Sequence, residues 1–299
     1  MFVVKYRKIW FALSVILLAL SFYAMFTYGF RLSIDFTGGA ITEVHYDGER
    51  PEKVSLENSI ETLGFGGFSI LPLEDDAYVI RTRELSEADR QNLEMALSFS
   101  NSTFTIERQN TVGPIAGAEL QSKAMKAVAV VVLMIVVFIT FAFRGVSKPV
   151  ASWKYGLATV IALAHDVIIP TGIFVFLGHF YGVEMDLLFV SGLLAILGYS
   201  VHDSIVVFDR VRENLKLNAE RNSQEPFEEI VGKSISQTFA RSINTSVTIF
   251  ITLFALYLVG PADTEDFALL LIIGVIVGTY SSIFVASPLL VTFYKLQKN

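Results

Sequence analysis

The sequence predicts a polytopic α-helical membrane protein: six transmembrane helices, with an α+β ferredoxin-like (βαββαβ) domain between the first two. Composition is the first indication, since 53% of the 299 residues are hydrophobic and only 17% are charged, against about 25% charged in soluble proteins. The second is that the apolar residues fall in blocks of roughly 20, the length that spans a bilayer as a helix. The third is a single long polar region after the first block.

Six apolar blocks are long enough to span the membrane. They cover residues 9–28, 124–143, 155–177, 187–208, 239–259 and 267–293. The first block follows Lys5, Arg7 and Lys8 and could be mistaken for a signal peptide, but no clear small-residue cleavage site follows it. We therefore expect a retained anchor.

Basic residues predict the orientation of the spans. They gather before the first span and after the second, fourth and sixth, as Lys5, Arg7, Lys8, Arg144, Lys148, Lys154, Arg210, Arg212, Lys216, Arg221, Lys233, Lys295 and Lys298. By the positive-inside rule, both termini are cytoplasmic and the large loop is extracytoplasmic. The expected domains are residues 1–29, 30–122 and 123–299, with a cytoplasmic loop at about 209–236.

The extracytoplasmic region, about 90 residues, is large enough for one small core. It holds about 16 acidic and about 7 basic residues, so most of the negative charge of the chain lies there. Alternating apolar patterns predict strands at 41–46, 68–71, 77–82 and 103–109, and helices at 55–63 and 86–97. Ser86 and Asp89 open the second helix in a capping-box pattern, and Glu74-Asp75-Asp76 forms a turn. This order is the split βαβ arrangement.

The polar segment 210–236 contains a helical apolar pattern after Pro226. Phe227, Ile230 and Val231 recur at the spacing of one helix face. We expect an amphipathic helix lying on the cytoplasmic membrane surface.

Ionisable residues inside the predicted spans are the strongest functional candidates. A charge at membrane depth costs about 2.5–3.5 kcal/mol on insertion scales and is usually kept for binding or transport. Asp203 and His202 lie in the fourth span, and His165 and Asp166 in the third. Arg241 opens the fifth.

Depth matching predicts an ion pair between Asp203 and Arg241. Asp203 lies seven residues before Arg210, about 10 Å along a helix, and Arg241 lies eight residues after Lys233, about 12 Å along its own. Such a pair is either a proton-sensitive element or a static contact between helices. Asp209 and Arg210, nearer the interface, are expected to form a boundary charge pair.

The roles of the other intramembrane groups stay open. Asp166 either extends a proton relay or packs through hydrogen bonds, and His165 is equally ambiguous. His202 points to another helix face than Asp203, because neighbouring helical residues diverge by about 100°.

Several function classes are excluded or disfavoured by missing motifs. The absence of cysteine excludes disulfides, thiolate metal sites and a cysteine nucleophile. No Gly-x-Ser-x-Gly elbow and no glycine-rich phosphate loop is present, and a net charge of −6 does not suggest a nucleic-acid partner. We expect no enzyme activity, no cofactor and no metal, so an ion gradient or a partner must supply energy.

Several motifs together resemble the SecF family of bacterial protein export, over nearly the whole chain. They are Ile34-Asp35-Phe36-Thr37-Gly38-Gly39, Val112-Gly113-Pro114, His165-Asp166-Val167, the run from Gly198 through Asp209 and Arg210 to Asn214, and Ser282-Ile283-Phe284-Val285-Ala286-Ser287-Pro288. The long fourth-span motif is highly specific.

The resemblance implies a proton-motive-force-driven accessory subunit in the bacterial inner membrane, related to the resistance-nodulation-division transporters. It implies a SecD-like partner that supplies six further spans, the SecYEG channel and unfolded preprotein as partners, and proton coupling at Asp203 and Arg241. The large loop is then periplasmic. His202 stands where the family more often has Asn, so it is either an additional proton site or a neutral hydrogen-bonding substitute.

Three alternatives remain. One is an ion-coupled exporter of small molecules or lipids from the same superfamily, although about 90 extracytoplasmic residues are few for a substrate cleft. Another is an assembly factor that only braces its partner. The third concerns the coupling ion, which is either a proton or sodium. Sodium stays possible because four residues that carry oxygen ligands lie near enough to bind it, namely Ser200, Ser204, Asn244 and Thr245.

Overall fold

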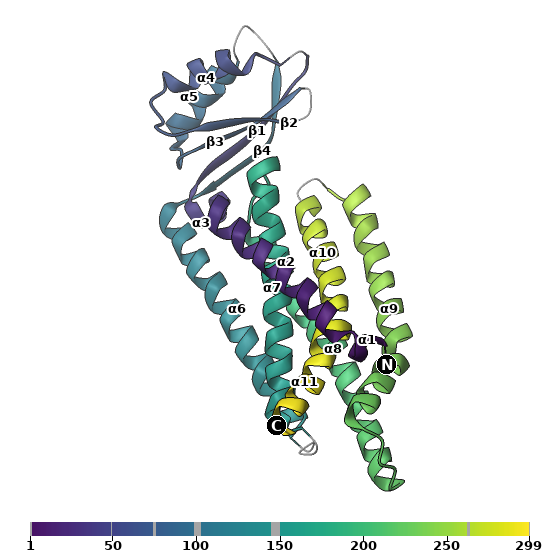
Figure 1. Ribbon diagram of the computed structural model, residues 1–299. Helices are drawn as coiled ribbons and strands as arrows, with labels where there is room; N and C mark the ends of the chain where they lie inside the picture. The colour runs from purple at the N-terminus through teal and green to yellow at the C-terminus, as the bar shows by residue number, and fades with distance from the viewer. Residues whose placement is uncertain are drawn as a thin grey trace. The chain divides into compact units, whose positions relative to one another are not determined.

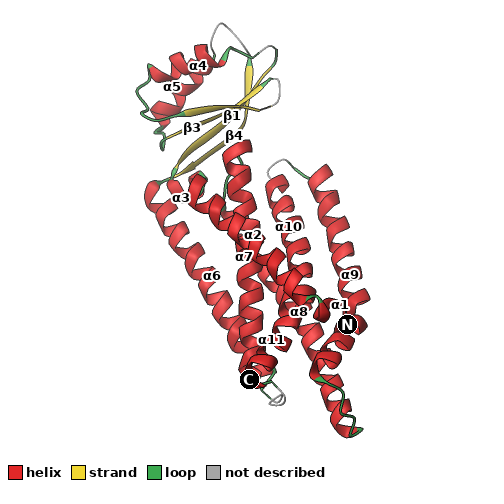
Figure 2. Ribbon diagram, viewed as in Figure 1, coloured by secondary structure: helices red, strands yellow, loops and turns green. Residues whose placement is uncertain are grey.

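The computed structural model describes residues 2–48, 50–73, 76–98, 103–144, 150–261 and 264–298 (Figure 1). The chain divides into two compact units, a helical unit of Met1–Arg31 with Lys126–Asn299 and a smaller unit of Leu32–Met125. Figure 2 shows that the sheet lies wholly in the smaller unit.

The helical unit confirms the expected six spans. Six helices in the described part of the chain are long and apolar enough to cross a membrane. They are α2 (Arg7–Tyr28), α6 (Pro114–Ala142), α7 (Ser152–Tyr181), α8 (Leu187–Glu220), α9 (Phe227–Val259) and a composite of α10 (Glu265–Ser281), the π-helical turn η3 (Ser282–Ala286) and α11 (Ser287–Lys298). A short helix, α1 (Phe2–Lys5), precedes them.

The centre of the bundle is formed by α7, α8 and the α10–α11 composite. About half or more of the apolar window of each is buried, at 56%, 50% and 61%, whereas α6 and α9 bury only 6% and 11% of theirs. Small residues permit this packing. A Cβ on Gly172 of α7 would lie 2.5 Å from the Ser21 Cα of α2, and a Cβ on Gly274 of α10 would collide with the Ile196 side chain of α8.

Segment 210–236 differs from the expected surface helix. Instead, α8 continues to Glu220, the chain turns, and α9 begins at Phe227. Phe227, Ile230 and Val231 are buried at 4%, 1% and 0% exposure. The helical spacing is therefore confirmed, but the apolar face packs against protein and not against lipid.

The smaller unit has the predicted βαββαβ order. After α3 (Ile34–Thr37) come β1 (Gly39–Tyr46), α4 (Lys53–Glu61), β2 (Ser69–Leu73), β3 (Ala77–Thr82), α5 (Glu87–Leu97) and β4 (Phe104–Val112). The antiparallel sheet has the order β2-β3-β1-β4. Ser86 and Asp89 form the expected capping box. Of the predicted turn at 74–76, residues 74 and 75 lie outside the described residues.

The core of this unit lies on one face of the sheet, under α4 and α5 (Figure 2). Val44 of β1 packs there with Leu56 and Ile60 of α4 and with Leu93 and Leu97 of α5. Because successive strand residues point to opposite faces, Glu43 and His45 lie on the other face, where both are half-buried.

Candidate functional site: two serine-bound aspartates in the helix bundle

Asp203 is buried on α8 and is held by two serine hydroxyls. The residue is 6% exposed. Ser242 of α9 donates to its Oδ1 at 2.6 Å, and Ser282 of η3 donates to its Oδ2. Each carboxylate oxygen therefore has a hydroxyl donor from a different element, which offsets part of the cost of burying it.

Asp166 on α7 has a similar environment. It is fully buried, and it accepts hydrogen bonds from Ser200 of α8 and, at 2.5 Å, from Ser281. Nδ1 of His165 lies 2.8 Å from its Oδ1. The His165 ring stacks on Tyr280 with ring centroids 5.8 Å apart, and the Tyr280 hydroxyl donates to the Trp10 carbonyl of α2 at 2.8 Å.

Two adjacent serines at the start of a π-helical turn serve both aspartates. Ser281 ends α10 and Ser282 begins η3, and both are fully buried. Adjacent helical residues diverge by about 100°, so Ser281 reaches Asp166 on α7 while Ser282 reaches Asp203 on α8. Single π-helical turns inside α-helices occur often at functional sites.

Further hydroxyls extend this polar cluster among α8, α9 and α10. The Tyr199 hydroxyl lies 2.6 Å from the Ser246 hydroxyl and 3.1 Å from that of Thr279. Ser246 and Thr279 are 2.7 Å apart, and Ser246 also donates to the Ser242 carbonyl at 2.7 Å. These hydroxyls therefore lie one helical turn after Ser242, toward the C-terminal end of α9.

A hydroxyl cage permits both protonation states of a carboxyl group. Each hydroxyl carries one donor and two acceptor lone pairs, so Ser242 and Ser282 can donate to an ionised Asp203 or accept from a protonated one. No cationic side chain of the described residues lies within ion-pair distance of Asp203. Its charge is therefore not locked by a counter-ion.

The predicted pair between Asp203 and Arg241 is not formed. Arg241 is exposed and makes no ion pair with a described residue, and its neighbour Ser242 contacts Asp203 instead. The two helices do meet at the expected depth, but the direction around the helix differs from the expectation, because one residue of offset turns a side chain by about 100°.

The remaining charged candidates lie outside the cluster. His202 is exposed on α8, as expected from its divergence from Asp203. Asp209 and Arg210 do not pair with each other. Asp209 pairs with Arg212 at 2.9 Å, and Arg210 with Glu213 at 2.8 Å, all with exposed side chains.

The motif residues Asp35, Phe36, Gly38 and Gly39 form a close junction in the smaller unit. Asp35 lies in the first turn of α3, and Phe36 is 7% exposed. Gly38 has φ +74°, and a Cβ there would lie 2.8 Å from the Pro114 Cα. Gly39 has φ +127°, and a Cβ there would lie 2.7 Å from the Thr82 carbonyl oxygen. Their absent side chains are required by backbone conformation and by contact.

Sequence reasoning did not identify the serines that bind the aspartates. It named Ser200 as a possible sodium ligand and Ser200 and Ser282 as parts of family motifs, and it did not name Ser242 or Ser281. The available signal for these serines was their position inside predicted spans. That signal is weak, because a serine in a helix commonly bonds to the backbone of its own helix. Only the packing of the helices shows which serines reach a neighbouring one.

Comparisons with known proteins agree with this architecture. The family described as "Protein export membrane protein SecD/SecF, C-terminal" matches residues 93–296, and "SecD/SecF GG Motif" matches residues 23–49. The chain is 36% identical to the protein translocase subunit SecF of Thermobaculum terrenum, covering 97% of this chain and 93% of that protein. It is 35% identical to SecF of Anaerolinea thermophila, covering 95% and 91%.

A solved structure shows the same fold. The crystal structure of SecDF, a translocon-associated membrane protein from Thermus thermophilus, matches with a TM-score of 0.83 and 35% identity over 98% of this chain. The chain spans 38% of the length of that protein. A match of this extent, together with the family match over two thirds of the chain, establishes that the chain belongs to the SecF family of protein translocase subunits.

Proposed function

We propose that this chain couples a proton gradient to preprotein export, together with a SecD-like partner and beside a SecYEG channel. Its termini would be cytoplasmic, and residues 32–125 would form a periplasmic domain that meets emerging preprotein. The observation that carries this proposal is Asp203, buried among α8, α9 and η3 and held by hydroxyls alone. A buried carboxylate without a counter-ion inside a membrane bundle is suited to exchanging a proton.

Protonation of Asp203 would change the contacts among three elements. The ionised carboxylate accepts from Ser242 and Ser282. A protonated carboxyl group becomes a donor at one oxygen, so one hydroxyl must turn to accept or lose its contact. Since Ser242 and Ser282 lie on α9 and η3, the proton alters how both are tied to α8. A local protonation can thereby bias a larger rearrangement of helices.

The exposed face of α9 supports a membrane-embedded partner. Exposed polar side chains recur along about 100° of this helix, at Gln237, Arg241, Asn244, Thr245, Thr248 and Thr252. Arg241 in contact with lipid would be costly, so we assign this face to the SecD-like half. The fused SecDF relative, of which this chain spans 38%, supports the same assignment. Arg241 would then act in coupling through the partner and not through Asp203.

The test is Asp203→Asn in the reconstituted complex. This change keeps the shape of the side chain and removes its titratable charge. We expect normal assembly with the partner and loss of preprotein translocation driven by an imposed proton gradient in proteoliposomes. Asp209→Asn is the matched control, because Asp209 lies on the same helix in an exposed ion pair, and it should export normally.

Full gradient-driven export by Asp203→Asn would contradict the coupling role and favour an assembly factor. The ion is tested separately, by imposing a sodium gradient without a proton gradient. Export under sodium alone would reject the proton in favour of sodium. For His202, an unchanged pH profile of export in His202→Asn would remove it from the proton path.

Asp166 and His165 are proposed to belong to the same proton path. The donors of the two aspartates are neighbours in the chain, because Ser281 donates to Asp166 and Ser282 donates to Asp203. Asp166→Asn should therefore reduce proton-driven export while the complex still assembles. Normal export in this variant would restrict Asp166 to hydrogen-bonded packing.

A further inference from the structure

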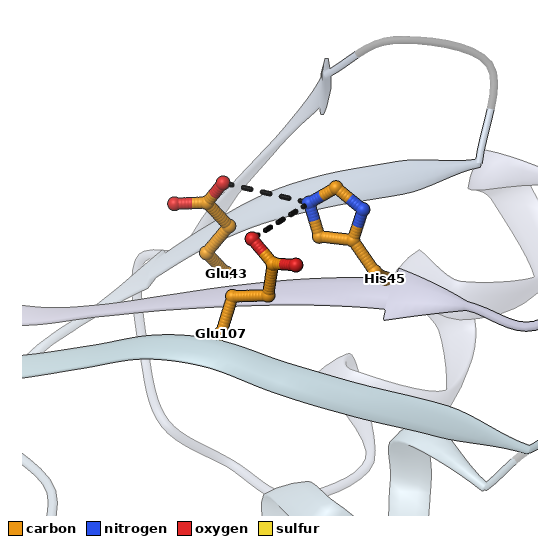
Figure 3. Close-up of side chains that lie close together, drawn as sticks. All are labelled: Glu43, His45 and Glu107. Atoms are coloured by element: carbon orange, nitrogen blue, oxygen red, sulfur yellow. Dashed lines mark ion pairs between the residues drawn. The ribbon is translucent and has the colours of Figure 1, made fainter. Parts of the chain in front are cut away.

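The open face of the sheet in the smaller unit carries a cluster of metal-binding side chains. Glu43 and His45 come from β1, and Glu107 comes from β4. The Nε2 atom of His45 lies 3.6 Å from Glu43 Oε1 and 3.5 Å from Glu107 Oε2. Figure 3 shows both carboxylates turned toward this nitrogen. One ligand atom from each of the three side chains lies within 4.8 Å of the others.

Strand alternation places Glu107 on this face, beside a β-bulge. Phe104 and Ile106 of β4 pack against the helix-covered core, so Glu107, the residue after Ile106, points to the opposite, open face. Glu43 is opposite Arg108 and Val44 is opposite Ile106, so Glu107 has no partner of its own on β1. A bulge of this kind bends the strand locally, and here it lies where Glu107 meets Glu43 and His45.

The nitrogen at the centre of the cluster has no hydrogen-bond partner. His45 Nε2 is inaccessible to solvent and, within the described part of the chain, forms no hydrogen bond. A buried polar atom left in this state is costly. A metal ion between Nε2 and the two carboxylates would satisfy all three groups together.

The spacing of the ligand atoms fits a tetrahedral ion. Zinc binds nitrogen and oxygen at about 2.0–2.2 Å, which places tetrahedral ligand atoms roughly 3.4 Å apart. The two distances from His45 Nε2, 3.6 and 3.5 Å, are close to this value. Imidazole favours zinc and similar transition metals, whereas magnesium and calcium favour all-oxygen sites.

The second nitrogen of the same ring has a carboxylate beside it. His45 Nδ1 lies 3.8 Å from Asp76 Oδ1, slightly beyond hydrogen-bond distance. Histidine ligands of metals commonly donate their other N–H to a carboxylate, which fixes the tautomer and ring orientation. A small rotation of Asp76 would complete this arrangement and leave Nε2 free to bind the metal.

We propose that Glu43, His45 and Glu107 bind a zinc-class divalent cation through one nitrogen and two carboxylate oxygens. Such an ion would tie β1 to β4 across the bulge, and it would leave one tetrahedral position for water or another ligand. The site is distinct from the membrane aspartates and does not depend on proton coupling. Sequence reasoning predicted no metal, because strand alternation gives the face of each residue but not which side chains of two strands converge.

The test is zinc binding to the purified full-length chain, freed of any affinity tag and treated with a chelator, by isothermal titration calorimetry near neutral pH. We expect one saturable site, with affinity lowered more than about tenfold by His45→Gln and by Glu107→Gln. Glu94→Gln, the same charge change on α5, should bind as the unmodified chain does. Cobalt should give a tetrahedral absorption spectrum that His45→Gln abolishes.

Thermal unfolding without metal shows whether each variant is folded, and Glu107→Gln should fold normally because the Glu107 side chain is 58% exposed. Absence of saturable zinc binding by the unmodified chain would overturn the proposal. So would equal affinity in folded Glu107→Gln and Glu94→Gln. If the unmodified chain binds no zinc, the cluster would be an ion pair of protonated His45 with the two glutamates.

Discussion

At the scale of single residues, the side chains that contact the Asp203 carboxylate are hydroxyl groups and not a cation. A guanidinium would hold the carboxylate ionised, but Arg241 faces outward and Ser242 takes its place. Hydroxyls accept or donate as needed. One residue of offset along α9 thus replaces the expected ion pair with a hydroxyl contact.

Tyr46 in the smaller unit gives a prediction about pH. It is 3% exposed, and its hydroxyl donates to the Leu97 carbonyl at 3.3 Å. Burial, with a smaller contribution from Tyr78, raises the pKa of Tyr46 from 10.0 to about 12. The folded state therefore favours the neutral phenol. Its contribution to stability is complete below pH 10 and is lost as pH rises from 10 through 12.

Thermal unfolding of the smaller unit, followed in the full chain, checks this window. Tm should fall between about pH 10 and about pH 12. In Tyr46→Phe, Tm should be lower near neutral pH, by the loss of one hydrogen bond of about 1 kcal/mol, and its alkaline decrease should be shallower. An equal alkaline slope in both proteins would assign the effect to other groups.

Three glycines separate backbone strain from steric contact. Gly39 has φ +127°, and a Cβ there would lie 2.7 Å from a backbone oxygen. Gly64 has φ +65° with open space around it, and Gly48 has open space without a positive φ. We expect Gly48→Ala to be nearly neutral and Gly64→Ala to cost about 1–2 kcal/mol. Gly39→Ala should cost more than either, because the Thr82 carbonyl must move. Chemical denaturation of the three variants ranks their losses of unfolding free energy. Equal losses for Gly39→Ala and Gly64→Ala would show that the contact with the Thr82 carbonyl relaxes freely.

At the scale of elements, η3 joins the two aspartates. The π-helical turn shifts the register between α10 and α11 while both remain packed against the centre of the bundle. Ser281 and Ser282 are neighbours at the start of this turn and bind different helices. A change at either aspartate therefore bears on the same short segment.

Removing the donors to Asp203 should favour its protonated form, since hydroxyl donation stabilises the ionised carboxylate. Ser242→Ala and Ser282→Ala should therefore increase labelling of Asp203 by a hydrophobic carbodiimide, which reacts with protonated carboxyl groups. Ser204→Ala is the matched control, because the Ser204 hydroxyl is buried on α8 beside Asp203 but forms no hydrogen bond within the described residues. Labelling unchanged in all three variants would mean that the hydroxyls do not influence the charge of Asp203.

At the scale of the whole molecule, the six apolar helices and the SecF family identify a multi-pass inner-membrane protein. Its helical unit is unevenly buried, with α9 exposing a polar face in addition to lipid-compatible residues. A partner that covers this face would complete the bundle, as the fused SecDF relative suggests.

The absence of cysteine makes this face directly measurable. Thr248→Cys lies on the exposed polar face of α9, and Val130→Cys lies on the exposed surface of α6, where valine is 56% exposed. In detergent, N-ethylmaleimide should modify both in the chain alone. Adding the SecD-like partner should protect Thr248→Cys and leave Val130→Cys reactive. Protection of neither would place the partner elsewhere.

Much of the architecture was predictable because it depends on local periodicity and composition. The number of spans follows from the length of apolar blocks, and the βαββαβ order follows from alternation and capping, as at Ser86. The extension of α8 to Glu220 was missed because polar residues carry no span signal, although they continue a helix readily.

The sequence by itself determined that Asp166 and Asp203 lie within the membrane-spanning helices, because a helix of apolar residues carries its charges to a depth set by about 1.5 Å per residue. Only the tertiary structure decided which groups meet them. Rotation about each helix axis is fixed by packing, which turned Ser242 inward and Arg241 outward. The same holds in the smaller unit, where the pairing of β1 with β4 brings Glu107 to His45.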